Sequence, residues 1–225
     1  MVPSLHYIGG IEIHTVIASC LLSYSFSGAA GAIAHARKGN MNWPLARWIC
    51  LGAIPGAAFG TVVVFNTNAN LLVLLVGLFV GFAAVSVMLQ NNVSTNTYST
   101  GSSLLLGVGA ISGFGSALSG SGGPLVLVPL LAWLRWPVLL AVGLGQIIQV
   151  PVSIVASLVN LFFGQLDIAL GLGIAIAVAT GAWIGAAIAH WLPAPVLRRI
   201  VLCALTLVAG WMLINSGLMF LPARL

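Results

Sequence analysis

A short glycine-rich stretch is the part of this sequence whose residue types could do chemistry. Ser119-Gly120-Ser121-Gly122-Gly123-Pro124 stands in the middle of the apolar segment 103–134. Glycine and proline interrupt a helix, so two half-helices would meet there and leave backbone N–H groups without a partner. Helix ends of this kind bind anions without a buried lysine or arginine, and glycine lets the anion approach the main chain. The stretch predicts an anion site comprising Ser116, Ser119, Gly120, Ser121, Gly122, Gly123 and Pro124, with the three serines as hydroxyl donors.

The small residues of this segment have a second interpretation, in which they only allow neighbouring helices to pack closely. We assign Gly107, Gly109 and Gly113 to packing alone. For Ser119 to Gly123 we favour the binding site. The reason is that irregular backbone inside a membrane persists only where it is buried or lines a cavity.

A polar stripe runs along the apolar segment 138–163. At about 100° per residue, five polar side chains fall within an arc of about 80° on one helix. They are Gln146, Gln149, Ser153, Ser157 and Asn160. Hydrogen bonding between helices is the alternative explanation. We interpret Gln146 and Gln149, which are nearest the glycine-rich stretch in sequence, as lining a path, and Asn160 as a structural residue.

A weaker series consists of Thr15, Ser19, Ser23 and Ser27 in the first apolar segment. Its intervals of four drift by about 40° per step, so the series winds around the helix. Serines also bond to carbonyl groups of their own helix, and we assign at least half of the series to that role. Only Ser19 and Ser23 remain as candidates for contact with a substrate.

Catalytic constellations are absent from the sequence. The two acidic residues, Glu12 and Asp167, fall at the ends of apolar segments, so a buried carboxylate proton relay has no residue to use. No Cys/His pair has metal-ligand spacing, and the HExxH motif is missing. A serine nucleophile at Ser119 would need His190, which we place at a membrane edge. We therefore predict neither an enzyme nor a cofactor or metal site.

The composition places these residues in a membrane. Hydrophobic residues make up 60% of the 225-residue chain and charged residues 4%, against about 25% in soluble domains. This balance excludes both a soluble domain and a disordered chain. The sequence has no lysine or arginine cluster that could follow a phosphate backbone, and this excludes a nucleic-acid partner. The three cysteines lie in apolar runs and are expected to be reduced. The sequence predicts a multi-pass protein of a prokaryotic-type cytoplasmic membrane.

Apolar segments long enough to span a bilayer recur along the chain, since about 20 residues suffice. They are 13–36, 44–65, 69–90, 138–163, 167–190 and 195–217. As one helix, 103–134 would be about 48 Å long, which exceeds a hydrocarbon core of about 30 Å. We therefore expect a re-entrant hairpin that enters and leaves on the same side.

The basic residues support this hairpin. With it, Arg37, Lys38, Arg47, Arg135, Arg198 and Arg199 all fall on the cytoplasmic side and only Arg224 falls outside. A single crossing by 103–134 would divide them almost evenly. Both termini are then expected outside the cytoplasm, with the uncharged segment 91–101 as a cytoplasmic hinge.

An internal repeat appears when the chain is shifted by 125 residues. Gly39, Gly56 and Gly60 then align with Gly164, Gly181 and Gly185, and Asn42 aligns with Asp167. Each unit would hold one hairpin and three crossings, so the second unit must be inverted, as in many transporters. The predicted parts are a first repeat (1–90), a polar linker (91–102) and a second repeat (103–225). Residues 1–9 correspond to the stub of a first hairpin, which leaves open whether the true start lies upstream. The predicted fold class is an all-α polytopic membrane protein with a degenerate inverted repeat.

Two stretches carry a family resemblance. GAISGFGSALSGSGGPLVLVPLL and HARKGNMNW, followed by LGAIPGAAFG, resemble the glycine-rich motifs of the TauE/SafE sulfite-exporter family. The resemblance covers about residues 11–217. It implies transport of small sulfur-containing or organic anions, including sulfite and sulfonates, across the cytoplasmic membrane. Glycine patterns identify the family better than the substrate.

We therefore predict a secondary transporter that exports sulfite or an organosulfonate. Residues 116–124 would bind the anion, Gln146 and Gln149 would line its path, and the two halves would rock about 91–101. Uptake of such anions, or a non-transporting scaffold or assembly factor, are the alternatives. The expected partners are a small anionic substrate and the lipid bilayer, and a homo-oligomer is compatible with the sequence.

Overall fold

The described part of the protein is helical. The computed structural model describes residues 2–7, 9–37, 42–68, 71–72, 74–75, 78, 85, 101–134, 136, 138–164, 166–189, 203 and 207. These residues contain helices and no strand. The helices are α1 (Val2–Tyr7), α2 (Ile13–Arg37), α3 (Trp43–Phe65), α5 (Ser102–Ser119), α6 (Pro124–Trp133), α7 (Val138–Phe162) and α8 (Ile168–Ala189).

The helices match the apolar segments that the sequence indicates. Within the described residues, four helices are long and apolar enough to cross a membrane: Ile13–Ile33, Trp43–Phe65, Ser102–Ser119 and Leu140–Phe162. Ile168–Gly181 is a shorter apolar stretch within α8. Most residues of the segments 69–90 and 195–217 lie outside the described residues. The prediction of an all-α polytopic membrane protein is confirmed.

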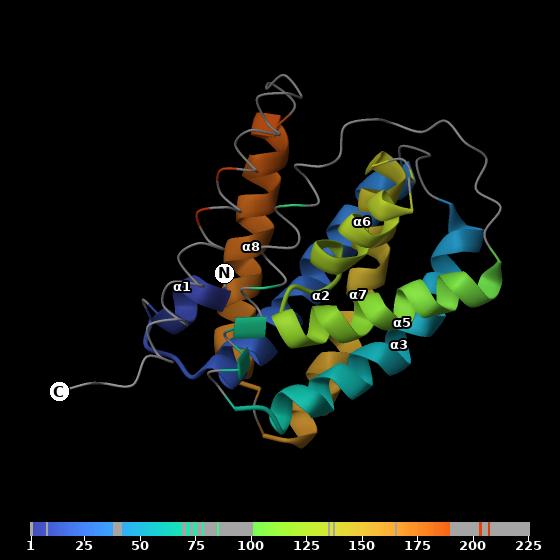
Figure 1. Ribbon diagram of the computed structural model, residues 1–225. Coiled ribbons are helices and arrows are strands. Elements are labelled where there is room, and N and C mark those ends of the chain that lie inside the picture. Colours follow the sequence, from blue (N-terminus) through green and yellow to red (C-terminus); the bar gives the residue numbers. More distant parts are fainter. Residues whose placement is uncertain are drawn as a thin grey trace.

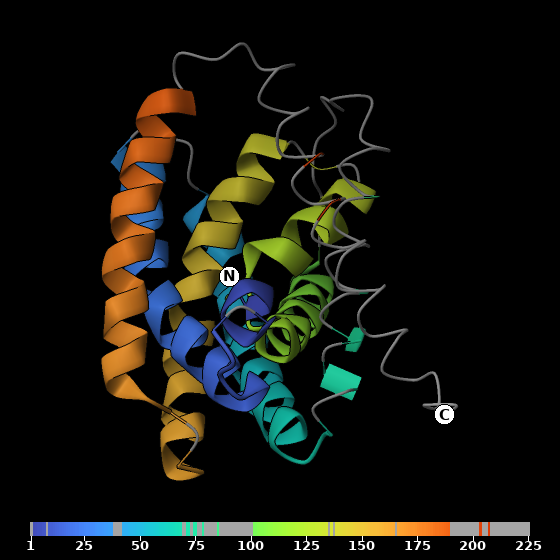
Figure 2. The same cartoon turned by 90° about the vertical axis from the view of Figure 1, so that its left-hand side faces the viewer.

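Neighbouring helices run parallel in some pairs and antiparallel in others. α2 and α7 are antiparallel, because Gly31 faces Gln146 while Gly28 faces Gln149. α3 and α7 are parallel, since Phe65 and Phe163 stack at their ends with ring centroids 4.3 Å apart. α8 begins beside the start of α2, where the Ser19 hydroxyl donates to the Asp167 carbonyl. Figure 2 shows α8 at the edge of the bundle, next to α2.

α3 and α5 run parallel and in close contact along their lengths (Figure 1). A Cβ atom at Gly52 or Gly56 of α3 would overlap the main chain of α5. Gly109 and Gly113 of α5 face the main chain of α3 in the same way, which agrees with their assignment to packing. The assignment of Gly107 is wrong. It is exposed, and among the described residues no atom of another element lies within 4 Å of its Cβ position, because it lies on the face of α5 that points away from α3.

Two buried clusters show the course of the broken segment. Leu105 near the start of α5 and Leu131 near the end of α6 share one cluster with Ile49 of α3. Leu118, at the end of α5, belongs to a second cluster with Ile17 of α2. The chain therefore runs from the first cluster to the second along α5, turns, and returns along α6. This is the course that a re-entrant hairpin requires, although its position in a bilayer stays a prediction.

The helix bounds agree with the proposed repeat. α2 and α7 each have 25 residues, and their first residues, Ile13 and Val138, differ by the predicted shift. α3 and α8 begin at Trp43 and Ile168, which differ by the same shift. The division into two repeats and a linker stays a prediction, since 91–100 lies outside the described residues.

Candidate functional site

The break between α5 and α6 is built on left-handed backbone. Gly120 (φ 60°) caps α5, and Gly122 (φ 78°) and Gly123 (φ 147°) continue the turn. Residues with a Cβ rarely adopt these angles, so glycine is required here for the turn itself. All three glycines are buried. The predicted interruption of the helix therefore lies where the sequence indicated, inside the bundle.

The turn leaves main-chain donors unpaired. The N–H of Ser121 bonds to the Ser116 carbonyl at 3.2 Å. The first bonds of α6 come from the N–H groups of Val126 and Leu127, which both donate to the Gly123 carbonyl, at 3.3 and 3.1 Å. Between them, the N–H groups of Gly122, Gly123 and Leu125 have no partner among the described residues. Proline at 124 contributes no N–H. Since α6 begins here, the positive end of its dipole lies beside these unpaired N–H groups.

The three serines at the break bond to the protein itself. The Ser119 hydroxyl lies 2.8 Å from the Gly115 carbonyl, and 2.7 Å from the Ser121 hydroxyl. The Ser116 hydroxyl is 3.5 Å from the carbonyl of Gly123. These contacts hold the turn together. In this arrangement the main chain provides the unpaired donors, rather than the hydroxyl groups that the sequence also suggested.

The structure brings the turn and the polar stripe together. A Cβ atom at Gly122 would lie 3.1 Å from Gln149 Cγ and 2.9 Å from Tyr24 Cβ. The Gln149 amide donates to the Ser27 hydroxyl across the α2–α7 interface at 3.2 Å. The site thus combines the α5–α6 turn with one face of α7 and one face of α2. The close packing also means that a bulky substitution at Gly122 would disturb the fold, in addition to any effect on an anion.

The rest of the stripe lies along the same face of α7, and all of it except Gln146 is buried. Asn160 donates to the Ala156 carbonyl of its own helix, which agrees with a structural role. Ser153 and Ser157 are buried with hydroxyls that have no partner among the described residues. Gln146 is half-buried beside Gly31 of α2. A path-lining role for Gln146 and Gln149 stays a prediction.

The serine candidates of α2 are buried and bonded. Ser19 donates to the Asp167 carbonyl at 3.2 Å, and Ser23 donates to the Cys20 carbonyl at 2.7 Å. Ser27 donates to Tyr24 in the same way. Half of the series therefore bonds to its own helix, to the carbonyl three residues back instead of four. Contact of Ser19 or Ser23 with a substrate stays a prediction.

Tyr24 and Ser27 are the residues at the turn that sequence reasoning missed. The sequence suggests no role for Tyr24, and it indicates that Ser27 bonds within its own helix. A signal was present, since Gly28 and Gly31 on one helix have the same spacing as Gln146 and Gln149 on the other. Matching intervals on two segments are weak evidence for contact without a structure.

These features define a class of protein. An apolar helical bundle with an interrupted helix, unpaired main-chain donors and polar side chains at the break is the arrangement of a multi-pass membrane transporter. The chain belongs to the sulfite exporter TauE/SafE family, whose model matches residues 1–212. It is similar to the probable membrane transporter protein YdhB of Bacillus subtilis (strain 168). The two are 23% identical over 204 residues, which is 85% of this chain and 81% of the relative.

No solved structure matches the chain. The family and the relative establish a multi-pass transporter of the cell membrane, which is not an enzyme in the usual sense. A small-molecule substrate and a lipid environment follow from that class.

Proposed function

We propose that the protein exports a small sulfur oxyanion, sulfite or an organosulfonate, and that it binds the anion at the turn between α5 and α6. The observation that carries this proposal is the set of unpaired N–H groups at Gly122, Gly123 and Leu125. Oriented N–H groups at a helix start favour negative charge. Sulfite as a substrate rests on the family description.

The charge distribution supports recognition by the main chain. Arg37 and Arg47 are exposed, one at the end of α2 and the other in the first turns of α3, away from the α5–α6 turn. The turn itself contains no ionisable side chain. An anion bound there would be held by N–H groups and helix dipole, with Gln149 and Ser27 beside it. Such a site binds without the strong attraction of a buried cation, which suits release on the other side.

A proline substitution tests the main-chain donors directly. Leu125→Pro removes one unpaired N–H while breaking no bond of the α6 ladder, and proline is tolerated in the first turn of a helix. A hydrogen bond to a charged group contributes about 1.5–3 kcal/mol, so we expect the Kd for sulfite to rise about tenfold or more. Leu125→Ala is the matched control, because it removes the side chain and keeps the N–H.

The measurement combines binding with flux. Substrate-dependent thermal stabilisation gives the Kd of the purified variants, and proteoliposomes with radiolabelled sulfite or a short sulfonate give the flux. If Leu125→Pro and Leu125→Ala bind the anion equally well, the site lies elsewhere, and Gln146 with Gln149 becomes the better candidate. Efflux from loaded vesicles of known orientation distinguishes export from uptake. A protein that moves neither anion would favour the scaffold alternative.

A further inference from the structure

Helices α3 and α8 hold equivalent places in the two proposed repeats, but their surroundings differ. α3 packs on α7, and α8 packs on α2, which is the counterpart of α7 in the repeat. α3 is also covered along its length by α5, which buries Gly52 and Gly60. Among the described helices, none covers α8 as α5 covers α3, and α8 stands at the edge of the bundle (Figure 2).

The face of α8 that corresponds to the α5-covered face of α3 is exposed. Gly52 and Gly56, where a Cβ atom would overlap the α5 main chain, correspond to Ala177 and Gly181 of α8. Ala177 and Gly181 are both exposed. In the described part of the chain, no atom of another element lies within 4 Å of the Cβ position of Gly181. The same face is therefore occupied by a helix on α3 and free on α8.

The free face of α8 has the residue pattern that α5 uses against α3. Its small residues, called the α8 stripe here, are Gly173, Ala177 and Gly181 at intervals of four. α5 turns Gly109 and Gly113 toward the α3 main chain, and its next residue at this interval, Ala117, lies 3.0 Å from the Cβ position of Gly60. Small residues at this spacing let two helix backbones approach closely inside a membrane. The α8 stripe matches both helices of the α3–α5 pair, so it is complementary to a copy of itself.

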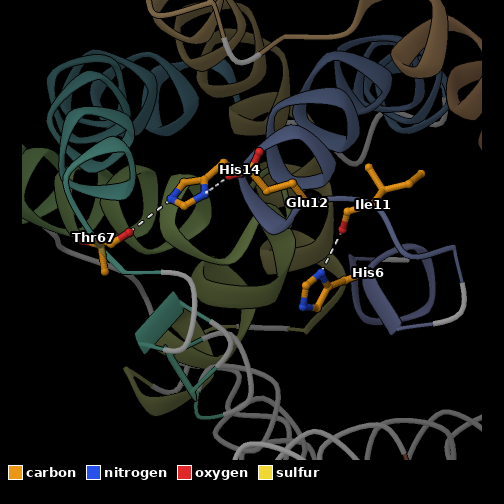
Figure 3. Close-up of polar contacts among 5 residues, drawn as sticks. All are labelled: His6, Ile11, Glu12, His14 and Thr67. Atoms are coloured by element: carbon orange, nitrogen blue, oxygen red, sulfur yellow. Dashed lines mark hydrogen bonds and ion pairs between the residues drawn. The ribbon is translucent and has the colours of Figure 1, made fainter. Parts of the chain in front are cut away.

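Helix α1 shows which part of a hairpin the first repeat contributes. Val2-Pro3 of α1 aligns with Val128-Pro129 in the second half of α6. α1 packs on α2, just as α6 packs on α7. The His6 Nδ1 atom lies 2.9 Å from the Ile11 carbonyl oxygen, which holds α1 beside the start of α2 (Figure 3). α1 is therefore the counterpart of the end of α6, and the described residues place no counterpart of α5 beside α8.

We propose that the α8 stripe binds the same stripe of a second copy of this chain, so that the protein forms a two-fold symmetric dimer. A two-fold contact joins one surface to itself, which requires the self-complementarity that the stripe has. All copies insert into the membrane in one orientation, so a two-fold axis normal to the membrane sets the two α8 helices parallel. This is also the relative direction of α3 and α5.

Disulfide cross-linking in native membranes tests the contact. In a background without Cys20, Cys50 and Cys203, Gly181→Cys supplies a single thiol. Equal positions face each other in a parallel two-fold contact, and a disulfide needs Cα atoms within about 7 Å. We expect a mild oxidant to convert most of this variant into a species of twice the mass of one chain. Ala179→Cys is the matched control, because Ala179 is also exposed at a similar depth but lies about 160° around the helix.

A bulky side chain in the stripe provides a second measurement. Gly181→Ile should hold two α8 helices apart, whereas within one chain it meets no described neighbour. Single-molecule photobleaching of labelled protein in vesicles gives the Kd of the dimer, and we expect this Kd to rise at least about tenfold. Gly107→Ile is the control, since Gly107 is an exposed glycine of α5 that lies outside the stripe.

Three results would overturn the proposal. One is a wild-type protein that stays monomeric in vesicles. Another is equal cross-linking of Gly181→Cys and Ala179→Cys, or no species of double mass, as expected if a different helix or lipid occupies this face. The third is a Gly181→Ile variant that dimerises as well as Gly107→Ile. None of these measurements needs a substrate, so they are independent of the proposed anion transport.

Discussion

Gly107 and Gly122 are both glycines, but only Gly122 occupies a position that requires glycine. Gly122 adopts φ 78° and is enclosed by Tyr24 and Gln149. Gly107 is helical and exposed, and no atom of another element in the described part of the chain lies within 4 Å of its Cβ position. The sequence showed that both lie in a glycine-rich apolar segment, but it could not show which glycine faces a neighbour. That distinction depends on the rotation of α5 about its axis against α3.

Alanine substitutions at these two glycines should have opposite effects. Gly122→Ala places a Cβ in left-handed backbone and against Tyr24, so we expect it to destabilise the protein by at least about 1–2 kcal/mol. Gly107→Ala should stabilise α5 by up to about 1 kcal/mol, because alanine loses less backbone entropy than glycine. Thermal unfolding in detergent measures both. Equal effects of the two substitutions would contradict the rotation of α5 described above.

At the scale of the element, equivalent positions of the two proposed repeats cap the start of a helix in the same way. The Asn42 side chain accepts the N–H of Leu45 and caps α3, and the Asp167 side chain accepts the N–H of Leu170 and caps α8. The alignment of Asn42 with Asp167 came from the sequence, which explained Asp167 only by its place at a membrane edge. The cap adds a structural reason for an acidic residue there, since negative charge favours the start of a helix.

The cap of α8 predicts how Asp167 responds to substitution. Asp167→Ala should destabilise the protein by about 1 kcal/mol, whereas Asp167→Asn should be close to neutral, because asparagine is an equally good N-cap. Unfolding of both variants at one pH measures the difference. A large loss in Asp167→Asn would mean that the charge matters beyond capping.

The sequence predicted where helices lie and where one is broken, but it predicted their partners poorly. Span positions follow from length and apolarity, and the break follows from glycine and proline at 120–124. The packing partners of each helix do not follow from the sequence, because lipid-facing and buried faces are both apolar in a membrane protein. Phe59 is 64% exposed and Ala57 is fully buried on the same helix, although both are apolar. The contact of Gln149 with Ser27 and the position of Gly122 beside Tyr24 and Gln149 depend on such pairings, so the composition of the site could be predicted only in part.

At the scale of the whole molecule, helix directions constrain the topology. α3, α5 and α7 share one direction, and α2, α6 and α8 share the other. The starts of α3 and α5 and the end of α6 therefore lie at one end of the bundle. The predicted placement of the basic residues makes this end cytoplasmic. A hairpin that returns along α6 and a helix that crosses completely would place Leu134 on opposite sides of the membrane.

Cysteine accessibility decides between these arrangements. In a background without Cys20, Cys50 and Cys203, single cysteines replace the exposed residues Trp43, Asn68, Ser103 and Leu134 in turn. In intact cells a membrane-impermeant thiol reagent should label Asn68→Cys only, because position 68 follows α3 at its outer end. The other three should be labelled only after permeabilisation, since they begin or end helices at the cytoplasmic side. Labelling of Leu134→Cys together with Asn68→Cys in intact cells would show that the α5–α6 segment crosses the membrane. The unpaired N–H groups at the turn would then need a different explanation.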